Sequence, residues 1–411
     1  MIHSSYYKPR IFPVQGDVTD AEIDRAQSID PTISLNRDKV EEIGRDGVVG
    51  YIKGSPEVGY RLTQLEYGNI EFWQKLVNSA VLGESGQTEI TLNDFKTNYF
   101  DICAYLTDDD GTFRGTVLYP ALRTAGFSIT IGDPEAIVER SFDFVGESAI
   151  TWQGSNKYWI YHRHDCGSGA DDTVDLSAKA PAEDPDNAGT YIYRVVRVRS
   201  GVSTVLESSD YSYVDATKIL TITSVQADDI IKVYYSSATA PDVQFTENDT
   251  DPAGIRADSV SIYLYIPASG KPSSSDYIYR LQSVTLECSF DREDHKEIGN
   301  KNVVKRGIND KTVTVTLGRF VEQFTVEEVL RGVASGYGKI DVEQFSDQIA
   351  LIIKVFSDNT KNTFKYGFKA TGLTPTELRG VTASVNAYTE QENTLEGEDL
   401  IISADVSKLG I

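Results

Sequence analysis

The sequence predicts a mainly β protein with two duplicated β-sandwich domains, each with one flanking α-helix, and a small inserted all-β, Ig-like domain. Residues 25–62 align without a gap on residues 280–317, and twelve of the 38 aligned positions are identical. Such a recurrence is typical of an internal repeat. Apolar and polar residues also alternate along many short segments, and tyrosine (23) outnumbers phenylalanine (16) in a mixture rich in β-branched residues, as is typical of strands.

The length and the repeat together predict the domain organisation. A chain of 411 residues is too long for one ordinary domain, because single hydrophobic cores stop growing at about 250–300 residues. The repeat predicts one unit at residues 1–165 and its copy at residues 246–411. Segments rich in Gly, Asp and Pro bound residues 166–245, which we expect to be a small peripheral β domain.

In the first unit, residues 29–36 alternate strictly between apolar and polar side chains, which predicts a half-buried strand. The glycine-rich residues 44–59 that follow predict a long hairpin or arm. In residues 70–82, Phe72 and Leu76 begin a helical spacing that predicts a helix. The remaining strands of this unit are expected at residues 99–106, 112–119, 126–132 and 141–152.

The second unit repeats this order. Residues 283–290 alternate like residues 29–36. A helix is expected at residues 324–333, where Thr325 and Glu328 form a capping-box pattern. Further strands are expected at residues 312–317, 348–356, 381–388 and 394–405. Within the insert, four short strands separated by turns favour an Ig-like module.

The sequence offers few residues for catalysis or cofactor binding. It has four histidines and no nucleophile-elbow, phosphate-loop or zinc-protease motif. His162, His164 and Cys166 are the one cluster of metal-ligand residue types, and no second ligand group with metal spacing accompanies it. We therefore expect no enzyme, no cofactor and no metal. The odd number of cysteines favours free thiols at Cys103, Cys166 and Cys288.

The net charge of −23 argues against a protein that grips nucleic-acid phosphates, because that function needs a basic surface. No apolar run approaches the roughly 20 residues that a membrane span requires. The start of the chain lacks the pattern of a secretory signal. Synthesis in a cytoplasm is the expectation.

One repeated motif resembles a family of virus proteins. In each unit a strand runs through a tract of charged residues into a Glu-Ile-Gly turn that precedes the hairpin. The matching residues are Arg37, Glu42, Ile43 and Gly44 in the first unit and Arg292, Glu297, Ile298 and Gly299 in the second. This stretch resembles the tail tube proteins, or major tail proteins, of tailed phages. The order strand, arm, strand, helix, strands also fits that family, over nearly all of the chain outside the insert.

The resemblance implies a structural subunit of a virion tail, assembled in the host cytoplasm. Six tube domains form a ring in that family, so two per chain imply homotrimeric, pseudo-hexameric rings. Stacked rings would form a hollow conduit for double-stranded DNA. The implied partners are further copies of the chain, a tape measure protein, a tail terminator and baseplate or tip proteins. The residues expected to line the lumen lie opposite the apolar strand faces: Thr32, Ser34, Asn36, Thr285, Glu287, Ser289 and Asp291.

Two other functions stay open at this point. A baseplate hub or distal tail ring would reuse the same fold but would occur once in each particle. A surface-binding adhesin would act through the insert, where clustered aromatic residues would make the contacts. The residues available for this are Tyr191, Tyr193, Tyr211, Tyr213, Tyr234 and Tyr235.

Overall fold

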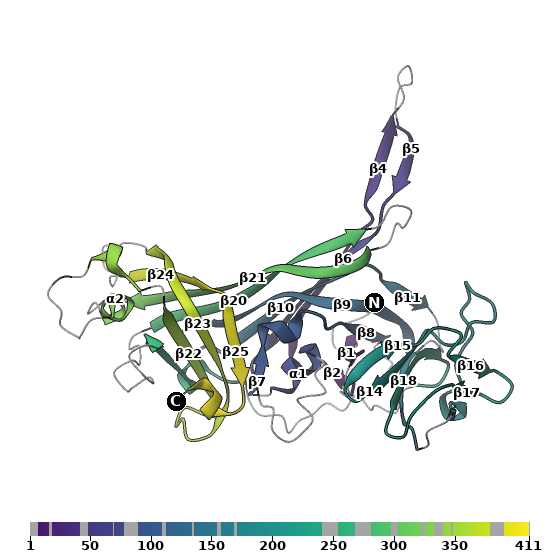
Figure 1. The fold of residues 1–411 in the computed structure, drawn as a ribbon. Coiled ribbons are helices and arrows are strands. Elements are labelled where there is room, and N and C mark those ends of the chain that lie inside the picture. Colours follow the sequence, from purple (N-terminus) through teal and green to yellow (C-terminus); the bar gives the residue numbers. More distant parts are fainter. Residues whose placement is uncertain are drawn as a thin grey trace.

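The protein is mainly β in the computed structural model, in which long antiparallel strands outnumber the helices (Figure 1). The structure describes residues 7–15, 19–41, 48–68, 70–77, 89–108, 112–133, 135–153, 158–167, 171–240, 254–267, 281–296, 303–321, 325–332, 339, 341–346, 348–378 and 390–410. Sixteen strands of these residues belong to one sheet, and two smaller sheets and one two-stranded hairpin complete the fold.

The first half of the fold comprises residues 7–153. Its elements are β1 (Tyr7–Pro13), β2 (Ala21–Glu22), β3 (Ala26–Ser34), β4 (Arg37–Glu41), β5 (Val48–Lys53), β6 (Glu57–Leu65), α1 (Glu71–Val77), β7 (Glu89–Thr91), the 3-10 helix η3 (Leu92–Phe95), β8 (Phe100–Thr107), β9 (Phe113–Ile131), β10 (Glu139–Gly146) and β11 (Ile150–Gln153). Strands β4 and β5 pair with each other and with no other described strand, and they stand away from the main sheet as an arm (Figure 1).

The second half comprises residues 254–410. Its elements are β19 (Val260–Tyr265), β20 (Leu281–Lys296), β21 (Val303–Phe320), α2 (Thr325–Arg331), η8 (Val342–Gln344), β22 (Ile349–Phe356), β23 (Phe364–Leu378), β24 (Glu390–Gly397), β25 (Asp399–Ser403) and η9 (Val406–Leu409). Here β20 and β21 pair continuously from the sheet into their hairpin.

The two halves have the same strand pairing. In the first, β3-β6-β10-β9 are neighbours, and the N-terminal part of β9 continues into a second layer with β8 and β1. In the second, β20-β21-β24-β23 are neighbours, and β23 continues in the same way with β22 and β19. Strand β20 pairs with β9, so the eight strands form one sheet in the order β3-β6-β10-β9-β20-β21-β24-β23.

The two halves also resemble each other in the irregularities of their strand pairing. Five register shifts occur at matching places in the two halves. The shift between β9 and β10 leaves Ala125 unpaired, and the shift between β23 and β24 leaves Thr376 unpaired. Both long strands also bend at a left-handed residue four positions earlier, Ala121 (φ 54°) and Gly372 (φ 66°). A bulge is a specific feature of a strand pair, so its repetition is informative.

Several expected elements differ in extent. Residues 112–119 and 126–132 were expected as two strands, but they belong to the single strand β9, whose bend and bulge preserve pairing on both sides. The helices expected at residues 70–82 and 324–333 are present as Glu71–Val77 and Thr325–Arg331, and residues 78–82, 324 and 333 lie outside the described residues. The strand expected at residues 381–388 lies outside the described residues, as do the repeated turn residues Glu42, Ile43, Gly44, Glu297, Ile298 and Gly299.

One hydrophobic core spans both halves. Trp73 of α1 is fully buried, and its ring makes edge-to-face contacts with Phe127 of β9, Phe142 of β10 and Phe368 of β23, with centroid distances of 4.9, 4.9 and 5.8 Å. Such contacts add to the burial of the rings themselves. Helix α1 therefore holds the two halves together on the apolar face of the eight-stranded sheet.

The insert consists of two small sheets around a core of its own. Its strands are β12 (Tyr158–Asp165), β13 (Asp172–Asp175), β14 (Arg194–Arg199), β15 (Val202–Val205), β16 (Tyr211–Val214), β17 (Ile219–Ile222) and β18 (Ile230–Ser237). Strand β12 lies before the expected boundary at residue 166 and pairs along its whole length with β18. Trp159 and Tyr234 of these strands pack with Phe12 and Tyr105 of β1 and β8.

Candidate functional site

The most unusual surface of the molecule is the free side of β3 and the arm beside it. Among the described strands, β3 pairs with β6 alone. On this strand and its continuation, Ile33 and Leu35 are 52% and 55% exposed. The arm adds the exposed side chains of Val48, Val49, Tyr51 and Ile52. Six large exposed hydrophobic residues therefore lie within twenty positions of the chain, and exposed apolar residues that gather in one region favour contact with another molecule.

The other end of the sheet is also open among the described residues. The C-terminal part of β23, Thr374–Leu378, pairs with β24 on one side, and none of the described strands pairs with its other side. An unpaired edge presents free N–H and C=O groups that another strand can bind. Among the described residues, the eight-stranded sheet thus has an open edge at each end.

The same kind of edge is closed inside the chain, where β20 meets β9. Cys288 lies opposite Phe127 in this antiparallel pair. The ring of Phe290 contacts Phe95 of η3 and Phe127, with centroids 5.6 and 6.3 Å apart. Cys288 and Phe290 are only 1% and 5% exposed as a result.

Arg292 fastens this internal junction. Its Nε donates a hydrogen bond to the carbonyl oxygen of Thr124 in β9 at 2.5 Å, and its Nη2 donates one to the carbonyl oxygen of Phe95 at 3.0 Å. A charged donor strengthens both bonds. The repeated arginine therefore joins the first strand of the second half to two elements of the first half.

The face of the eight-stranded sheet opposite the core is polar and acidic. Alternation along the paired strands places the acidic residues Asp30, Glu57, Glu139, Asp143, Glu287, Asp291, Asp310, Glu377, Glu390, Glu392 and Glu396 on this face. Two arginines also lie on this face: Arg61 is paired with Asp30 and Asp143, and Arg123 is paired with Val145. Small residues lie between them, as in the rung that joins Thr285 to Thr130 and Thr316. The face is therefore strongly negative.

Six of the seven residues expected to line a lumen share this polar face. Thr32 and Ser34 are exposed on β3, Glu287, Ser289 and Asp291 are exposed on β20, and Thr285 is half-buried there. Asn36 is placed differently, because it lies beyond the end of β3 with a φ of 23°. Its side chain is engaged locally: Nδ2 donates to the carbonyl oxygen of Ser55, and Oδ1 accepts from the hydroxyl of Ser34.

A buried charged group links the two halves behind the sheet. Arg140 Nη1 lies 3.2 Å from Glu66 Oε2, and both side chains are essentially inaccessible. The hydroxyl of Tyr366 in β23 donates to the same carboxylate. Although burial alone would lower it, the charge of Glu66 raises the pKa of Arg140 above its ordinary value. Sequence reasoning did not single out this group, since its members are far apart in the chain.

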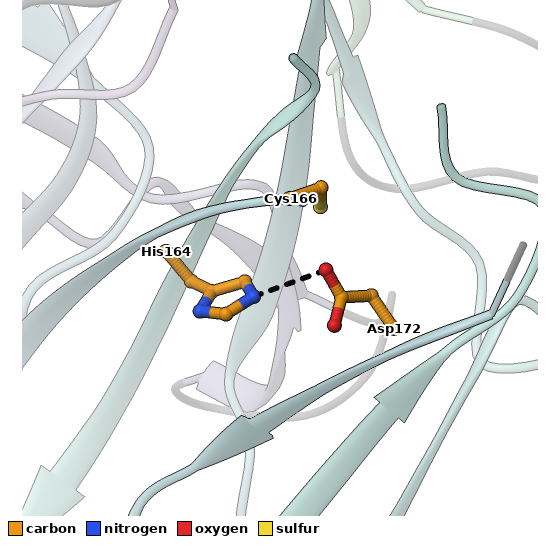
Figure 2. A group of neighbouring side chains, drawn as sticks. All are labelled: His164, Cys166 and Asp172. Atoms are coloured by element: carbon orange, nitrogen blue, oxygen red, sulfur yellow. Dashed lines mark hydrogen bonds and ion pairs between the residues drawn. The ribbon is translucent and has the colours of Figure 1, made fainter. Parts of the chain in front are cut away.

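A small cluster of metal-ligand residue types lies in the insert. Figure 2 shows His164 of β12 facing Asp172 of β13, with the sulfur of Cys166 beside them. His164 Nε2 lies 3.2 Å from Asp172 Oδ2. The sequence did not predict that Asp172 joins His164 and Cys166, because its spacing from them fits no metal-binding motif. His162, the other expected member, is not part of the cluster.

The cluster forms a structural link within the insert. Burial and a hydrogen bond with Asp172 raise the pKa of Cys166 to about 12, which keeps the free thiol protonated at neutral pH. Metal coordination would displace that proton, and the three side chains offer three of the four ligands of a closed tetrahedral zinc site. The hydrogen bond between His164 and Asp172 connects the two sheets of the insert.

A cavity of about 440 Å³ lies between the insert and β11. Aromatic side chains from both parts line it, including Trp152, Trp159, Tyr191 and Tyr193. Asp186 and Asn187 add polar groups. Tyr193 is 46% exposed, so part of this aromatic lining is accessible to solvent.

In the part of the chain that the structure describes, no helix has the length and apolarity to cross a membrane. The chain was also compared with known proteins. No protein-family model matches it, and no curated protein sequence is similar to it.

Proposed function

We propose that the chain is a structural subunit of a virus tail tube, not an enzyme, and that it assembles into rings with further copies of itself. The observation that carries this proposal is the eight-stranded sheet, which has an open edge at each end and one closed junction of the same type in its middle. A subunit with two different complementary edges makes head-to-tail contacts, and these close into a ring when the rotation permits.

The proposal includes an internal duplication of a β-sandwich domain, with residues 1–165 and 246–411 as the two copies. The shared pairing order and the five matching register shifts support it. One buried ladder rung supports it further. Arg140 is paired with Gln64 in the first half, and Arg319 with Gln391 in the second. The arginine and glutamine have exchanged strands, which preserves the side-chain pair at an equivalent position.

Three chains are proposed for each ring, which gives a pseudo-hexamer. Eight strands from each of three chains make a barrel of 24 strands. With strands about 4.8 Å apart and tilted by about 40°, such a barrel is about 48 Å across between backbones. Side chains of about 5 Å on each wall leave about 38 Å, enough for a DNA duplex about 20 Å across.

The acidic face of the sheet is proposed to line this channel, with the insert outside. A duplex in the centre would lie about 9 Å from the wall, which is about one Debye length at physiological salt. Repulsion between two negative surfaces is still felt at that distance. The wall would therefore let DNA pass without binding it, whereas lysines there would release counterions and hold it. The assembly would be part of the virion, with the family's tape measure, terminator and tip proteins as partners.

The direct test of this function is assembly of the purified full chain. Negative-stain microscopy and sedimentation should show rings or hollow tubes that grow with protein concentration. Ile33→Lys should abolish them without lowering the unfolding midpoint of the monomer, because Ile33 is exposed. Ile137→Lys is a matched control, since Ile137 is also exposed but lies away from both edges. A protein that stays monomeric at millimolar concentration would rule the proposal out.

A second candidate, supported by the aromatic cavity, is surface binding through the insert. Aromatic faces with neighbouring carboxyl and amide groups suit a saccharide, whose apolar faces stack on the rings. Titration with cell-surface polysaccharides should then show binding that Tyr193→Ala removes and that Tyr211→Ala, outside the cavity lining, leaves unchanged. A chain that binds saccharides and forms no rings would favour this adhesin function over the tube. A baseplate hub or distal ring would form rings that do not stack.

A further inference from the structure

We propose that the internal junction between β20 and β9 is the template for the contact between neighbouring chains, in which β3 of one copy pairs with β23 of the next. The inference rests on the proposed function in one respect, namely that the chain associates with itself. It goes further by assigning the strand register and the side chains of the contact.

The repeat defines which residues are equivalent. A shift of 255 positions relates β3 to β20, so Ile33 and Leu35 correspond to Cys288 and Phe290. A shift of 251 positions relates β9 to β23 through their matching bulges, so Phe127 corresponds to Leu378. Because Cys288 lies opposite Phe127 within the chain, Ile33 should lie opposite Leu378 of the second copy.

Burial supports this correspondence. Cys288 and Phe290 are covered by the first half and are nearly inaccessible, whereas their equivalents Ile33 and Leu35 are about half exposed. The two pairs of side chains have the same direction on equivalent strands. We attribute the difference to the neighbouring domain, which covers Cys288 and Phe290. A second copy docked in the same way would cover both side chains.

The partner side of the junction is also present. Phe95, which receives the ring of Phe290, lies three residues after the start of η3. Phe345 lies three residues after the start of η8 and is half-buried at the margin of the core. Leu35 of one copy should therefore contact Phe345 and Leu378 of the next.

Arg37 completes the contact. It is exposed and equivalent to Arg292, whose guanidinium donates to the carbonyl oxygens of Thr124 and Phe95. The equivalent acceptors in the second half are the carbonyl oxygens of Pro375 and Phe345. Arg37 should donate hydrogen bonds to both across the interface.

The spacing of the strands has to differ between the two junctions at one pair of opposite residues. A Cβ atom at Gly126 would lie 2.9 Å from the carbonyl oxygen of Cys288, so the internal strands approach too closely for a side chain there. The equivalent residue of β23 is Glu377. The strands should therefore be slightly farther apart beside Ser34 than they are beside Ser289.

The test is disulfide cross-linking of the full chain with Ile33→Cys and Leu378→Cys together. Residues directly opposite in antiparallel strands have Cα separations that a disulfide can bridge. Mild oxidation should give covalent oligomers of two and more chains on a non-reducing gel, ending at the number of chains in a ring. The control pair Ile33→Cys with Glu377→Cys places the sulfurs on opposite faces and should not cross-link. The native thiols are buried.

Arg37→Ala provides a second measurement. It should raise the concentration needed for half-maximal assembly about tenfold, and Arg163→Ala on the insert should not change it. Two results would overturn the register and leave the proposed function in place. In one, rings form normally while the cysteines at positions 33 and 378 stay reduced. In the other, rings form and the control pair at positions 33 and 377 cross-links. A chain that forms no rings under any condition would overturn both.

Discussion

At the scale of single residues, two charged pairs are buried between the sheet and the elements behind it. Glu66 joins Arg140 of the first half to Tyr366 of the second, and Arg319 is paired with Glu327 at 2.5 Å. Removal of one partner from a buried ion pair is costly, because the remaining charge loses its compensation. These residues hold the sheet to the elements behind it.

Arg140→Met should lower the free energy of unfolding by about 3–5 kcal/mol, since it leaves the Glu66 carboxylate buried without its cation. Combining it with Glu66→Gln should recover part of the loss. Urea denaturation of the purified variants measures both effects. As a control, Arg163→Met removes an ion pair at the surface and should cost less than about 1 kcal/mol. Equal losses in the single and double variants would contradict this account of the pair.

A second residue prediction concerns pH. Hydrogen bonds from Arg199 lower the pKa of Asp229 in the insert below its ordinary value of 3.8. The folded protein thus binds this proton less readily than the unfolded chain does. The stabilisation is complete above the ordinary pKa and is lost as pH falls through the lowered one. Asp229→Asn should therefore destabilise the protein at pH 7, and this loss of stability should shrink as the pH falls below the ordinary pKa of Asp229. A difference that is unchanged by pH would contradict this origin.

At the scale of elements, β9 and β23 show why one strand can serve two layers. Each bends at a left-handed residue, Ala121 or Gly372, and each has a bulge four residues later. Neither the alanine nor the bulge leaves a recognisable sequence signal, so β9 was predicted as two strands. Each of these two long strands therefore pairs in the eight-stranded sheet at one end and in the second layer at the other.

The two bends give a paired prediction. Gly372→Ala should lower the free energy of unfolding by about 1 kcal/mol, because alanine at positive φ is strained, although no atom would obstruct its Cβ. Ala121→Gly should be neutral or stabilise by up to about 1 kcal/mol, since the relief of strain is partly offset by the entropy of the unfolded chain. Thermal unfolding compares the two. A loss of stability in Ala121→Gly similar to that in Gly372→Ala would show that backbone strain is not the deciding effect.

The sequence predicted the alternating strands and their repetition because a period of two residues is visible without tertiary information. It could not predict contacts that are formed by distant elements. Asp172 meets His164 only through the folding of the insert. The predicted apolar face of residues 29–36 was expected to be half-buried, but Ile33 and Leu35 are exposed in the single chain. A hydrophobic pattern shows that a face favours burial and does not show which chain covers it.

At the scale of the whole molecule, the acidic face of the sheet leads to a charge prediction. Glu287→Lys combined with Asp291→Lys should leave the fold intact, because both residues are exposed and Asp291 lies opposite another acid, Asp310. Assembled rings of this variant should bind a short DNA duplex at 50 mM salt and release it at 200 mM. Wild-type rings should not bind it. Glu135→Lys with Glu207→Lys makes the same charge change outside this face, and equally strong binding by that control would contradict a lumen at the acidic face.

The central claim is that the open edges of one chain meet those of the next and close a ring. The most direct measurement is an electron cryomicroscopy reconstruction of the assembled protein. The account predicts three copies in a closed ring, a continuous barrel in which β3 of each copy is hydrogen-bonded to β23 of its neighbour, and the acidic face inside. An assembly whose copies meet through the insert, or a ring whose barrel is interrupted between β3 and β23, would contradict it.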